Sequence, residues 1–338
     1  MKLHNSYFGA MEQMKAVVRR AYCSPASLRL ENWPKPVPQK GEVLIKIMAS
    51  TVNRTDCGIL TGSPWAIRLF TGLWKPRSPI TGSDFAGEIV ALGAEVSGYQ
   101  LGDRVWGMHD NGLPSHAQFM CYSVKHPMAI IPEGITFEQA AASIEGAHYA
   151  LNFINKVQLK PGSRILLNGA TGAIGSAALQ ILVARGFWVT ATCNTKNMER
   201  IAALKPSALI NYELEDFTKL PETFDFVFDA VGKSHFNACK SILAPKGIYI
   251  SSELGPGAEN LYLPLFTKLK GGKWVVFPIP FNIPKSLETM GALLKSGGFK
   301  PLIDRTYSLE QVAEAFEYVA SGQKTGNVLL QPQVGGHK

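Results

Sequence analysis

One continuous run, residues 164–180, restricts the possible folds of this chain more than any other segment. It contains, in direct succession, a short apolar stretch typical of a buried strand, a glycine-containing turn and an apolar stretch typical of a helix start. Gly172 would let the backbone close on phosphates and Gly175 would let the helix pack on the strand, while the helix N-terminus offers free N–H groups. The run therefore predicts a dinucleotide-binding turn; the alternative is an ordinary strand–helix connection.

The residues expected to contact the dinucleotide lie in the turn itself. Ala170 stands where the usual fingerprint has its first glycine, which is a departure from that pattern. The predicted contact residues are Ala170, Thr171, Gly172, Ala173, Ile174 and Gly175.

The residues after the next expected strand, 188–193, indicate which dinucleotide is bound. That strand should end over the adenosine ribose, where an enzyme that uses NAD typically places Asp or Glu on the 2′-hydroxyl. No acid follows it directly: the chain continues Asn194, Thr195, Lys196, and Arg200 comes one helical turn later. Donors and cations suit a 2′-phosphate, so the pattern favours NADPH. The alternative is that Lys196 and Arg200 are solvated charges at a helix start.

Composition excludes several function classes. The chain has 338 residues, enough for two domains with their own cores. Its net charge of +8 comes from dispersed Lys and Arg, so we expect an anionic cofactor rather than nucleic acid. The apolar runs are strand-sized and residues 1–13 lack a signal-peptide core, so no membrane association is expected. Five cysteines without CxxC spacing indicate a reducing compartment, and we expect a cytoplasmic protein.

The chain has two parts with different sequence patterns. Short β-type runs punctuated by Gly and Pro fill the first part, which suggests a β-rich, partly barrel-like domain. From about residue 137, strands and helices alternate as they do in a doubly wound parallel sheet. The fold class predicted from this rhythm is α/β.

Seven segments occur in the order typical of a known family. They are residues 41–47, 49–56, 82–93, 102–107, 164–180, 228–232 and 322–328. On these segments the chain resembles the medium-chain dehydrogenase/reductase superfamily, and more narrowly its zinc-independent quinone oxidoreductase branch. The resemblance implies a Rossmann cofactor domain inserted in a GroES-like catalytic domain, with the active site in the cleft between them. The implied boundaries are 1–136 and 279–338 for the two parts of the catalytic domain, and 137–278 for the cofactor domain.

The resemblance also bears on metal content. Zinc-dependent relatives place a Cys where Asn53 stands and a His-Glu pair where Ser83 and Asp84 stand. Asn, Ser and Asp at these places cannot make the tetrahedral site that catalytic Zn²⁺ requires. We therefore expect no metal.

The implied chemistry is hydride transfer from NADPH to an electron-poor carbon of a quinone or an α,β-unsaturated carbonyl compound. The resemblance places Asn53 as a donor to the carbonyl and Asp56 as a neighbour that orders the loop; the alternative is that they cap a short helix. His148 stands where relatives usually have Thr, close to the nicotinamide. It could deliver a proton there, or equally fill space on an apolar helix.

Further cofactor contacts are implied by the resemblance alone. Tyr212 is expected against the adenosine phosphate, and Val231 and Gly232 beside the nicotinamide ribose. Phe277 is expected at the carboxamide and Asn327 at the pyrophosphate.

Assembly and alternative functions complete the expectations. Residues 271–277 lie where relatives pair edge strands across a two-fold axis, so we expect a homodimer. A 2-enoyl thioester reductase is a second enzyme hypothesis, and the absence of tyrosine from residues 53–68 counts against it. A third hypothesis is a sensor or interaction protein that binds NADPH without turnover.

Overall fold

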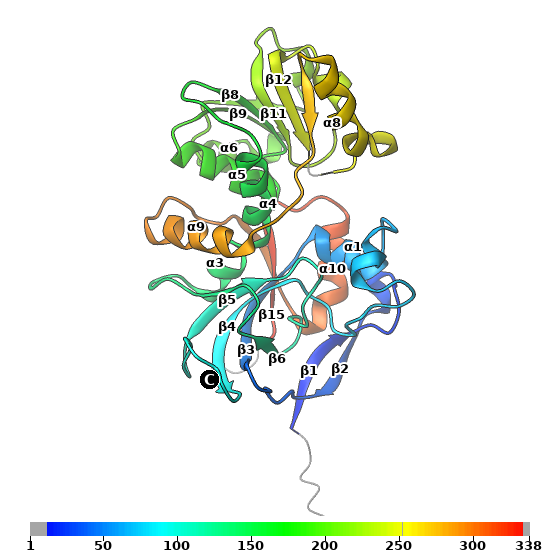
Figure 1. The fold of residues 1–338 in the computed structure, drawn as a ribbon, viewed down its shortest axis with the longest axis vertical. Helices are drawn as coiled ribbons and strands as arrows, with labels where there is room; N and C mark the ends of the chain where they lie inside the picture. Colours follow the sequence, from blue (N-terminus) through cyan, green and yellow to red (C-terminus); the bar gives the residue numbers. More distant parts are fainter. Residues whose placement is uncertain (1–11, 252, 334–338) are drawn as a thin grey trace, which may run out of the picture.

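The computed structural model describes residues 12–251 and 253–333, which form two bodies stacked along the long axis of the molecule (Figure 1). One body contains a six-stranded parallel sheet and is called here the parallel-sheet body. The other contains a sheet built from both ends of the chain and is called the terminal body. The predicted α/β fold, with a Rossmann-type sheet inserted in a β-rich domain, is confirmed.

The terminal body is built around one long central strand. Its strands are β1 (Gln13–Val18), β2 (Arg29–Pro34), β3 (Glu42–Val52), β4 (Asp84–Leu92), β5 (Arg104–Met108), β6 (Phe119–Ser123), β7 (Met128–Ile130), β14 (Ile303–Ser308) and β15 (Asn327–Gln331). β3 pairs antiparallel with β4 and β6, and its last residues pair with β15. The apolar side chains Val43, Ile45 and Ile47 of β3 are fully buried in a cluster with apolar side chains of β4, β5 and β6. The late strand β15 thus completes a sheet that begins near the N-terminus.

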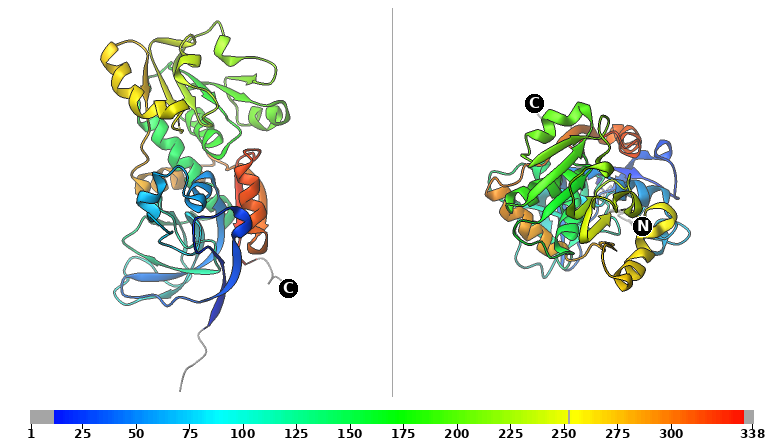
Figure 2. Two further views of the ribbon diagram at one scale, coloured as in Figure 1. Left: turned by 90° about the vertical axis from the view of Figure 1, so that its right-hand side faces the viewer. Right: turned by 90° about the horizontal axis from the view of Figure 1, so that it is seen from above.

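The helices of this body come from both the early and the late parts of the chain. They are α1 (Arg54–Thr61), α2 (Ile67–Thr71), α3 (Phe137–Ala141), α9 (Ile283–Lys295) and α10 (Val312–Ala320). α10 packs beside α1, as both views of the ribbon show (Figure 1; Figure 2). The predicted domain boundaries stay predictions, and α3, expected to open the cofactor domain, packs against β3 and β4 of the terminal body.

The parallel-sheet body has the topology of a doubly wound fold. Its strands are β8 (Arg164–Asn168), β9 (Trp188–Cys193), β10 (Ala208–Asn211), β11 (Phe224–Asp229), β12 (Leu243–Ser251) and β13 (Trp274–Val276). Its helices are α5 (Ala173–Ala184), α6 (Met198–Ala202), α7 (Phe236–Cys239) and α8 (Glu259–Lys270). In the order β10-β9-β8-β11-β12-β13 the direction of winding reverses between β8 and β11. Ligands of such sheets bind beyond the carboxyl ends of the strands at that reversal.

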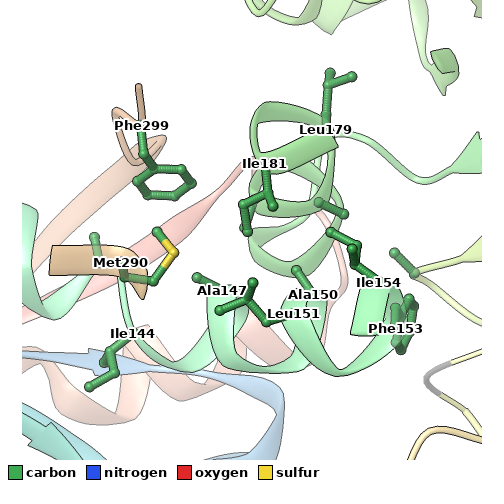
Figure 3. Close-up of a cluster of buried hydrophobic side chains, with 14 of the residues drawn as sticks. Ile144, Ala147, Ala150, Leu151, Phe153, Ile154, Leu179, Ile181, Met290 and Phe299 are labelled. Carbon is green, nitrogen blue, oxygen red and sulfur yellow. The ribbon is translucent and has the colours of Figure 1, made fainter. Parts of the chain in front are cut away.

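One helix, α4 (Glu145–Asn155), connects the two bodies (Figure 1). Its apolar side chains lie between those of α5 and α9, so that Leu151 packs in one cluster with Ile181 and Met290 (Figure 3). The same cluster continues to Trp106 of β5 and Leu167 of β8. Because one continuous apolar core spans both bodies, separating them would expose buried apolar surface, which water disfavours.

Within residues 12–251 and 253–333, no helix has both the length and the apolar character needed to cross a bilayer.

Candidate active site

A cavity of about 610 Å³ lies where the carboxyl edge of the parallel sheet meets the terminal body. Its size is typical of a small-molecule site. One wall comes from the turn after β8 and from residues 212–217 after β10. The opposite wall includes Asn53, Arg54, Glu145 and Lys324. The cavity is therefore the place where a dinucleotide and a second reactant could meet.

The turn after β8 is shaped by two glycines with different tasks. Gly172 is the N-cap of α5 and makes no side-chain cap, so the first amides of the helix have no intrahelical partner. A Cβ on Gly172 would find its nearest atom, the carbonyl oxygen of Gly169, at 3.8 Å, which leaves room on the cavity side. A Cβ on Gly175 would lie 2.1 Å from that same oxygen, so this glycine allows the helix to pack on the strand, as predicted.

The turn fits a dinucleotide pyrophosphate on these observations. Thr171, Gly172, Ala173 and Ile174 line the cavity, and free amides at a helix N-terminus with the positive end of the helix dipole bind anions. Ala170, a predicted contact, is instead fully buried and does not line the cavity.

Gly169 lines the cavity beside Ala170 and carries the positive φ of the turn. Its φ is +86°, and a Cβ there would lie 2.3 Å from Cγ1 of Val231. The departure at Ala170 therefore costs the turn nothing, because the preceding glycine supplies the left-handed backbone. Gly175, also a predicted contact, lies behind the turn and not on the cavity surface.

The four polar residues predicted for the 2′-phosphate do not line the cavity. Lys196 is exposed and forms no ion pair with any described residue. Nη2 of Arg200 donates to the carbonyl oxygen of Ile303 at 2.6 Å, and Asn194 accepts from the side chain of Asn197. Because this N–H donor of Arg200 is already bound within the protein, Arg200 has fewer donors free for a ligand.

Thr195, the fourth of them, is bound to a residue that the sequence analysis missed. Its N–H and Oγ1 both donate to Oε2 of Glu213, at 3.0 and 2.7 Å. Glu213 lines the cavity next to Tyr212, whose predicted place beside the cofactor agrees with that lining. No pattern near Glu213 indicated this contact, because it arises from the parallel pairing of β10 with β9. The carboxyl ends of paired parallel strands meet at one edge.

A buried acid organises the turn after β11. Asp229 accepts hydrogen bonds from the backbone N–H of Gly232 at 3.0 Å and from the hydroxyl of Tyr249 at 2.9 Å. Burial raises the pKa of Asp229, and the bond from Tyr249 acts in the opposite direction. Val231 lines the cavity at this turn, whereas Gly232 does not.

Phe277 and Asn327 do not line the cavity either. The side-chain amide of Asn327 donates to the carbonyl oxygen of Leu302 at 3.1 Å. These two predicted cofactor contacts are therefore not among the residues that line this cavity.

The helix-cap interpretation of Asn53 and Asp56 is confirmed. Oδ1 of Asn53 accepts from the N–H of Asp56 at 2.8 Å, and the carboxylate of Asp56 accepts in return from the N–H of Asn53 at 3.1 Å, which is a capping box at the start of α1. Nδ2 of Asn53 donates to Oγ of Ser83 at 2.9 Å. Asn53 lines the cavity, but its hydrogen-bonding groups are directed to the protein, and Asp56 is buried behind it.

The residues at the position of zinc in related enzymes form a closed hydrogen-bond network. Asp84 is fully buried and accepts from the N–H of Thr51 at 2.7 Å and from its hydroxyl. Burial raises the pKa of Asp84 to about 7, while the bonds from Thr51 lower it. In residues 12–251 and 253–333, no group of three or more His, Cys, Asp or Glu side chains is arranged to hold a metal ion. The donor set around Asn53 does not fit catalytic zinc.

A second buried carboxylate lies on the cavity wall. Glu145, at the start of α4, accepts from the hydroxyl of Thr55 at 2.8 Å. Burial raises its pKa, and the bond from Thr55 and the charge of Lys324 lower it. Nζ of Lys324 donates to the carbonyl oxygen of Gly326 at 2.7 Å. Glu145 and Lys324 thus place a carboxyl and an amino group at the terminal-body side of the cavity.

His148 lies about one helical turn after Glu145 on α4 and, unlike Glu145, does not line the cavity. It is fully buried, and Nδ1 lies 2.8 Å from Oγ of Ser286 on α9. The amide of Asn152 lies 3.4 Å from its Nε2. Burial lowers the pKa of His148 to about 4, so the ring is neutral at physiological pH. The arrangement agrees with the packing interpretation, because the ring contacts Ser286 and Asn152 and does not line the cavity.

Comparison with known proteins agrees with this geometry. Residues 39–143 match the family described as alcohol dehydrogenase GroES-like domain, and residues 206–330 match the family described as zinc-binding dehydrogenase. A 2-methylene-furan-3-one reductase of Solanum lycopersicum is 29% identical over 331 residues, which are 95% of this chain and 79% of that protein. A chloroplastic NADPH-dependent alkenal/one oxidoreductase of Arabidopsis thaliana is 26% identical over 332 residues, which are 95% of this chain and 80% of that protein. Among solved structures, the quinone oxidoreductase from Coxiella burnetii superposes with a TM-score of 0.84 at 26% identity, covering 95% of this chain and 100% of that one.

Proposed function

This chain belongs to the medium-chain dehydrogenase/reductase superfamily, in its quinone oxidoreductase-like branch, and we propose that it transfers hydride from NADPH to quinones or α,β-unsaturated carbonyl compounds. The observation that carries the proposal is the cavity. It joins a pyrophosphate-binding turn on one wall to buried polar side chains on the other. Relatives named as reductases of furanones, alkenals and quinones agree with substrates that spread negative charge over a conjugated carbonyl group.

The turn after β8 would hold the dinucleotide. The amides at the start of α5 would bind the pyrophosphate, Tyr212 would lie against the adenosine, and Val231 would lie beside the nicotinamide ribose. When bound, NADPH supplies a hydride to the electron-poor carbon of the substrate. The protein then has to orient the two reactants and stabilise the negative charge that develops on the carbonyl oxygen.

We propose Arg54 as the donor to that oxygen, in place of the predicted Asn53. Arg54 is the first residue of α1, is exposed and lines the cavity, and its side chain makes no hydrogen bond within the described part of the chain. Its positive charge acts on Glu253, which also lines the cavity. Burial raises the pKa of Glu253, and the charge of Arg54 lowers it by a smaller amount. Asn53 has its amide bound to Ser83, so it would act by capping the helix that presents Arg54.

The proposed reaction uses no metal. The side chains at the position of the zinc ligands bond to each other, so no step is assigned to zinc. Elemental analysis of the purified protein should therefore find no stoichiometric zinc. One zinc per chain would contradict the proposal.

A homodimer through β13 is also proposed. β13 pairs only with β12 in the described sheet, which leaves its outer edge open. Pairing with the same strand of a second copy would cover that edge. Exposed apolar side chains of the neighbouring helix α8, Leu265 and Phe266, would gain cover from the same contact. Light scattering on the purified protein should give twice the chain mass.

A cytoplasmic location remains part of the proposal. All five cysteines are free thiols in the structure, which agrees with a reducing environment.

The test of the reaction is the loss of NADPH absorbance with a panel of quinones and enones in the presence of a chelator. Rapid oxidation of NADPH is expected with at least one class of acceptor. If NADPH binds, by its fluorescence, but is not oxidised by any acceptor, the quinone and enone proposal is wrong. A panel of 2-enoyl thioesters would then separate the thioester reductase from a protein that binds NADPH without turnover.

A further inference from the structure

The adenosine end of the cavity contains an acid that the proposed preference for NADPH does not explain. Glu213 lines the cavity, while Thr195, which would be a donor to a 2′-phosphate, does not. Both donors of Thr195, the N–H and the hydroxyl, are bound to the single oxygen Oε2 of Glu213. The side chain of Glu213 therefore covers the groups that a 2′-phosphate would use.

Several bonds hold this arrangement in place. The side-chain amide of Asn211 donates to Oγ1 of Thr195 at 2.8 Å, and Oδ1 of Asn211 accepts from the N–H of Glu213 at 3.1 Å. The bonds from Thr195 lower the pKa of Glu213, so the side chain is ionised at neutral pH. The carboxylate of Glu213, which follows β10, thus places a full negative charge at the end of the neighbouring strand β9.

The two cofactors would meet this carboxylate differently. Oε1 of Glu213 has no protein partner among the described residues, so it can accept a hydrogen bond from a ribose 2′-hydroxyl while Oε2 keeps its bonds to Thr195. A 2′-phosphate carries negative charge itself. To reach Thr195 it would have to displace Glu213 from both donors, against charge repulsion. Lys196, which has no ion-pair partner in the described residues, is the group that would oppose that repulsion.

We infer that Glu213 is a specificity-determining residue that limits the preference for NADPH by occupying the donors of Thr195. The inference rests on the proposed function, because it concerns how the same cavity chooses between two dinucleotides. It predicts that the protein accepts NADH as well as NADPH, and that removing the charge of Glu213 increases the preference for NADPH.

Adenosine fragments test this without any reaction. Calorimetry would measure the dissociation constants of 2′,5′-ADP and 5′-ADP for the wild-type protein, for Glu213→Gln and for the control Glu215→Gln. Glu215 lines the same cavity and its side chain makes no hydrogen bond to any described residue, so the control removes an equal charge without freeing Thr195. We expect Glu213→Gln to lower the dissociation constant of 2′,5′-ADP about fivefold. The dissociation constant of 5′-ADP should change less than twofold.

Each outcome decides the inference. If Glu213→Gln leaves the ratio of the two dissociation constants unchanged, or if Glu215→Gln changes it equally, Glu213 does not act through Thr195 and the inference is wrong. If Glu213→Gln weakens 2′,5′-ADP, Glu213 supports the phosphate site and the inference is also wrong. If neither fragment binds the wild-type protein, the dinucleotide site itself fails, which is a different failure from an unchanged ratio.

A second variant separates the covered donors from simple charge repulsion. With Thr195→Val in the background, the hydroxyl that Glu213 covers is gone. The gain from Glu213→Gln for 2′,5′-ADP should then be smaller than in the wild-type background. An equal gain would leave only long-range repulsion and would contradict the proposed role of Thr195.

Discussion

At the nucleotide end of the cavity the binding surface is mostly backbone, whereas at the terminal-body end it is mostly side chain. The turn after β8 offers amides and the space left by Gly172, and the side chains of Thr195 and Lys196 after the neighbouring strand β9 are exposed. At the other end Asn53, Asp84 and Glu145 are buried and bonded to their neighbours. Steric fit therefore dominates the first end, and desolvated polar bonds dominate the second. Substitutions at the two ends should fail in different ways.

The largest effect is expected at the backbone end, for Gly175→Ala. The new Cβ would lie 2.1 Å from a backbone oxygen of Gly169, which cannot move without shifting the strand–helix turn. The free energy of unfolding should fall by about 3 kcal/mol, measured by urea denaturation. Gly172→Ala is the matched control: its Cβ has 3.8 Å of clearance, so stability should fall by only about 1 kcal/mol while NADPH affinity falls at least about tenfold. Equal stability losses would remove the steric distinction between the two glycines.

The next effect concerns His148, beneath the side-chain end. Its folded-state pKa of about 4 lies below the unfolded value of about 6.5, so its contribution to stability is present above pH 6.5 and is lost as the pH falls towards 4. Glutamine keeps a polar group for Ser286 and does not titrate. The stability of His148→Gln relative to wild type should therefore improve by about 3 kcal/mol between pH 7 and pH 4.

Urea unfolding of both proteins at several pH values measures this difference, and it cancels the similar titration of His116, whose pKa burial also lowers to about 4. Parallel stability curves would show that His148 is not held neutral. Turnover at pH 7.5 should stay close to the wild-type rate, and a loss of more than tenfold would return His148 to the catalytic groups.

A smaller effect is expected for Arg54→Met at the side-chain end. If Arg54 donates to the developing oxyanion, kcat should fall about tenfold or more while the dissociation constant of NADPH changes less than threefold. Arg54→Lys keeps the charge and should restore part of kcat. If kcat with Met equals that of wild type, another group on the wall, such as Lys324, supplies the donor.

The smallest effect is expected for Lys196→Ala at the exposed nucleotide end. Loss of one exposed charge should weaken the binding of NADPH about fivefold and the binding of NADH less than twofold, as measured by fluorescence titration. Lys125→Ala, an exposed charge in the terminal body, is the control and should change neither. Equal losses for the two cofactors would remove Lys196 from the 2′-phosphate site.

Local patterns predicted the architecture well because they depend on neighbours in sequence. The strand, turn and helix around Gly172 lie within one stretch, and Gly175 has the packing task that its spacing predicted. The two parts of the chain with different sequence patterns also correspond to the two large sheets. The capping box of Asn53 and Asp56 is equally local, and it was one of two interpretations that the residues allowed.

The site was harder to predict because its members come from segments far apart in the chain. Glu145 and Lys324 meet at the cavity although 179 positions separate them, and no pattern near either one indicates the other. Glu213 covers Thr195 because β10 pairs with β9, which only the order of strands decides. For His148 the sequence left a catalytic and a packing role open, and only the fold shows its contact with Ser286 on the distant helix α9.

The amino-acid sequence by itself determined the backbone chemistry of this protein: where the phosphate turn forms, which helix begins there, and that Asn, Ser and Asp replace zinc ligands. These features follow from short-range geometry and from the identity of single side chains. Only the tertiary structure decided which polar groups remain available to a ligand. Packing buried His148 and closed the bonds of Asn53, and strand pairing placed Glu213 on Thr195. Availability depends on which distant segments compete for the same hydrogen bonds, and only the folded chain brings those segments together.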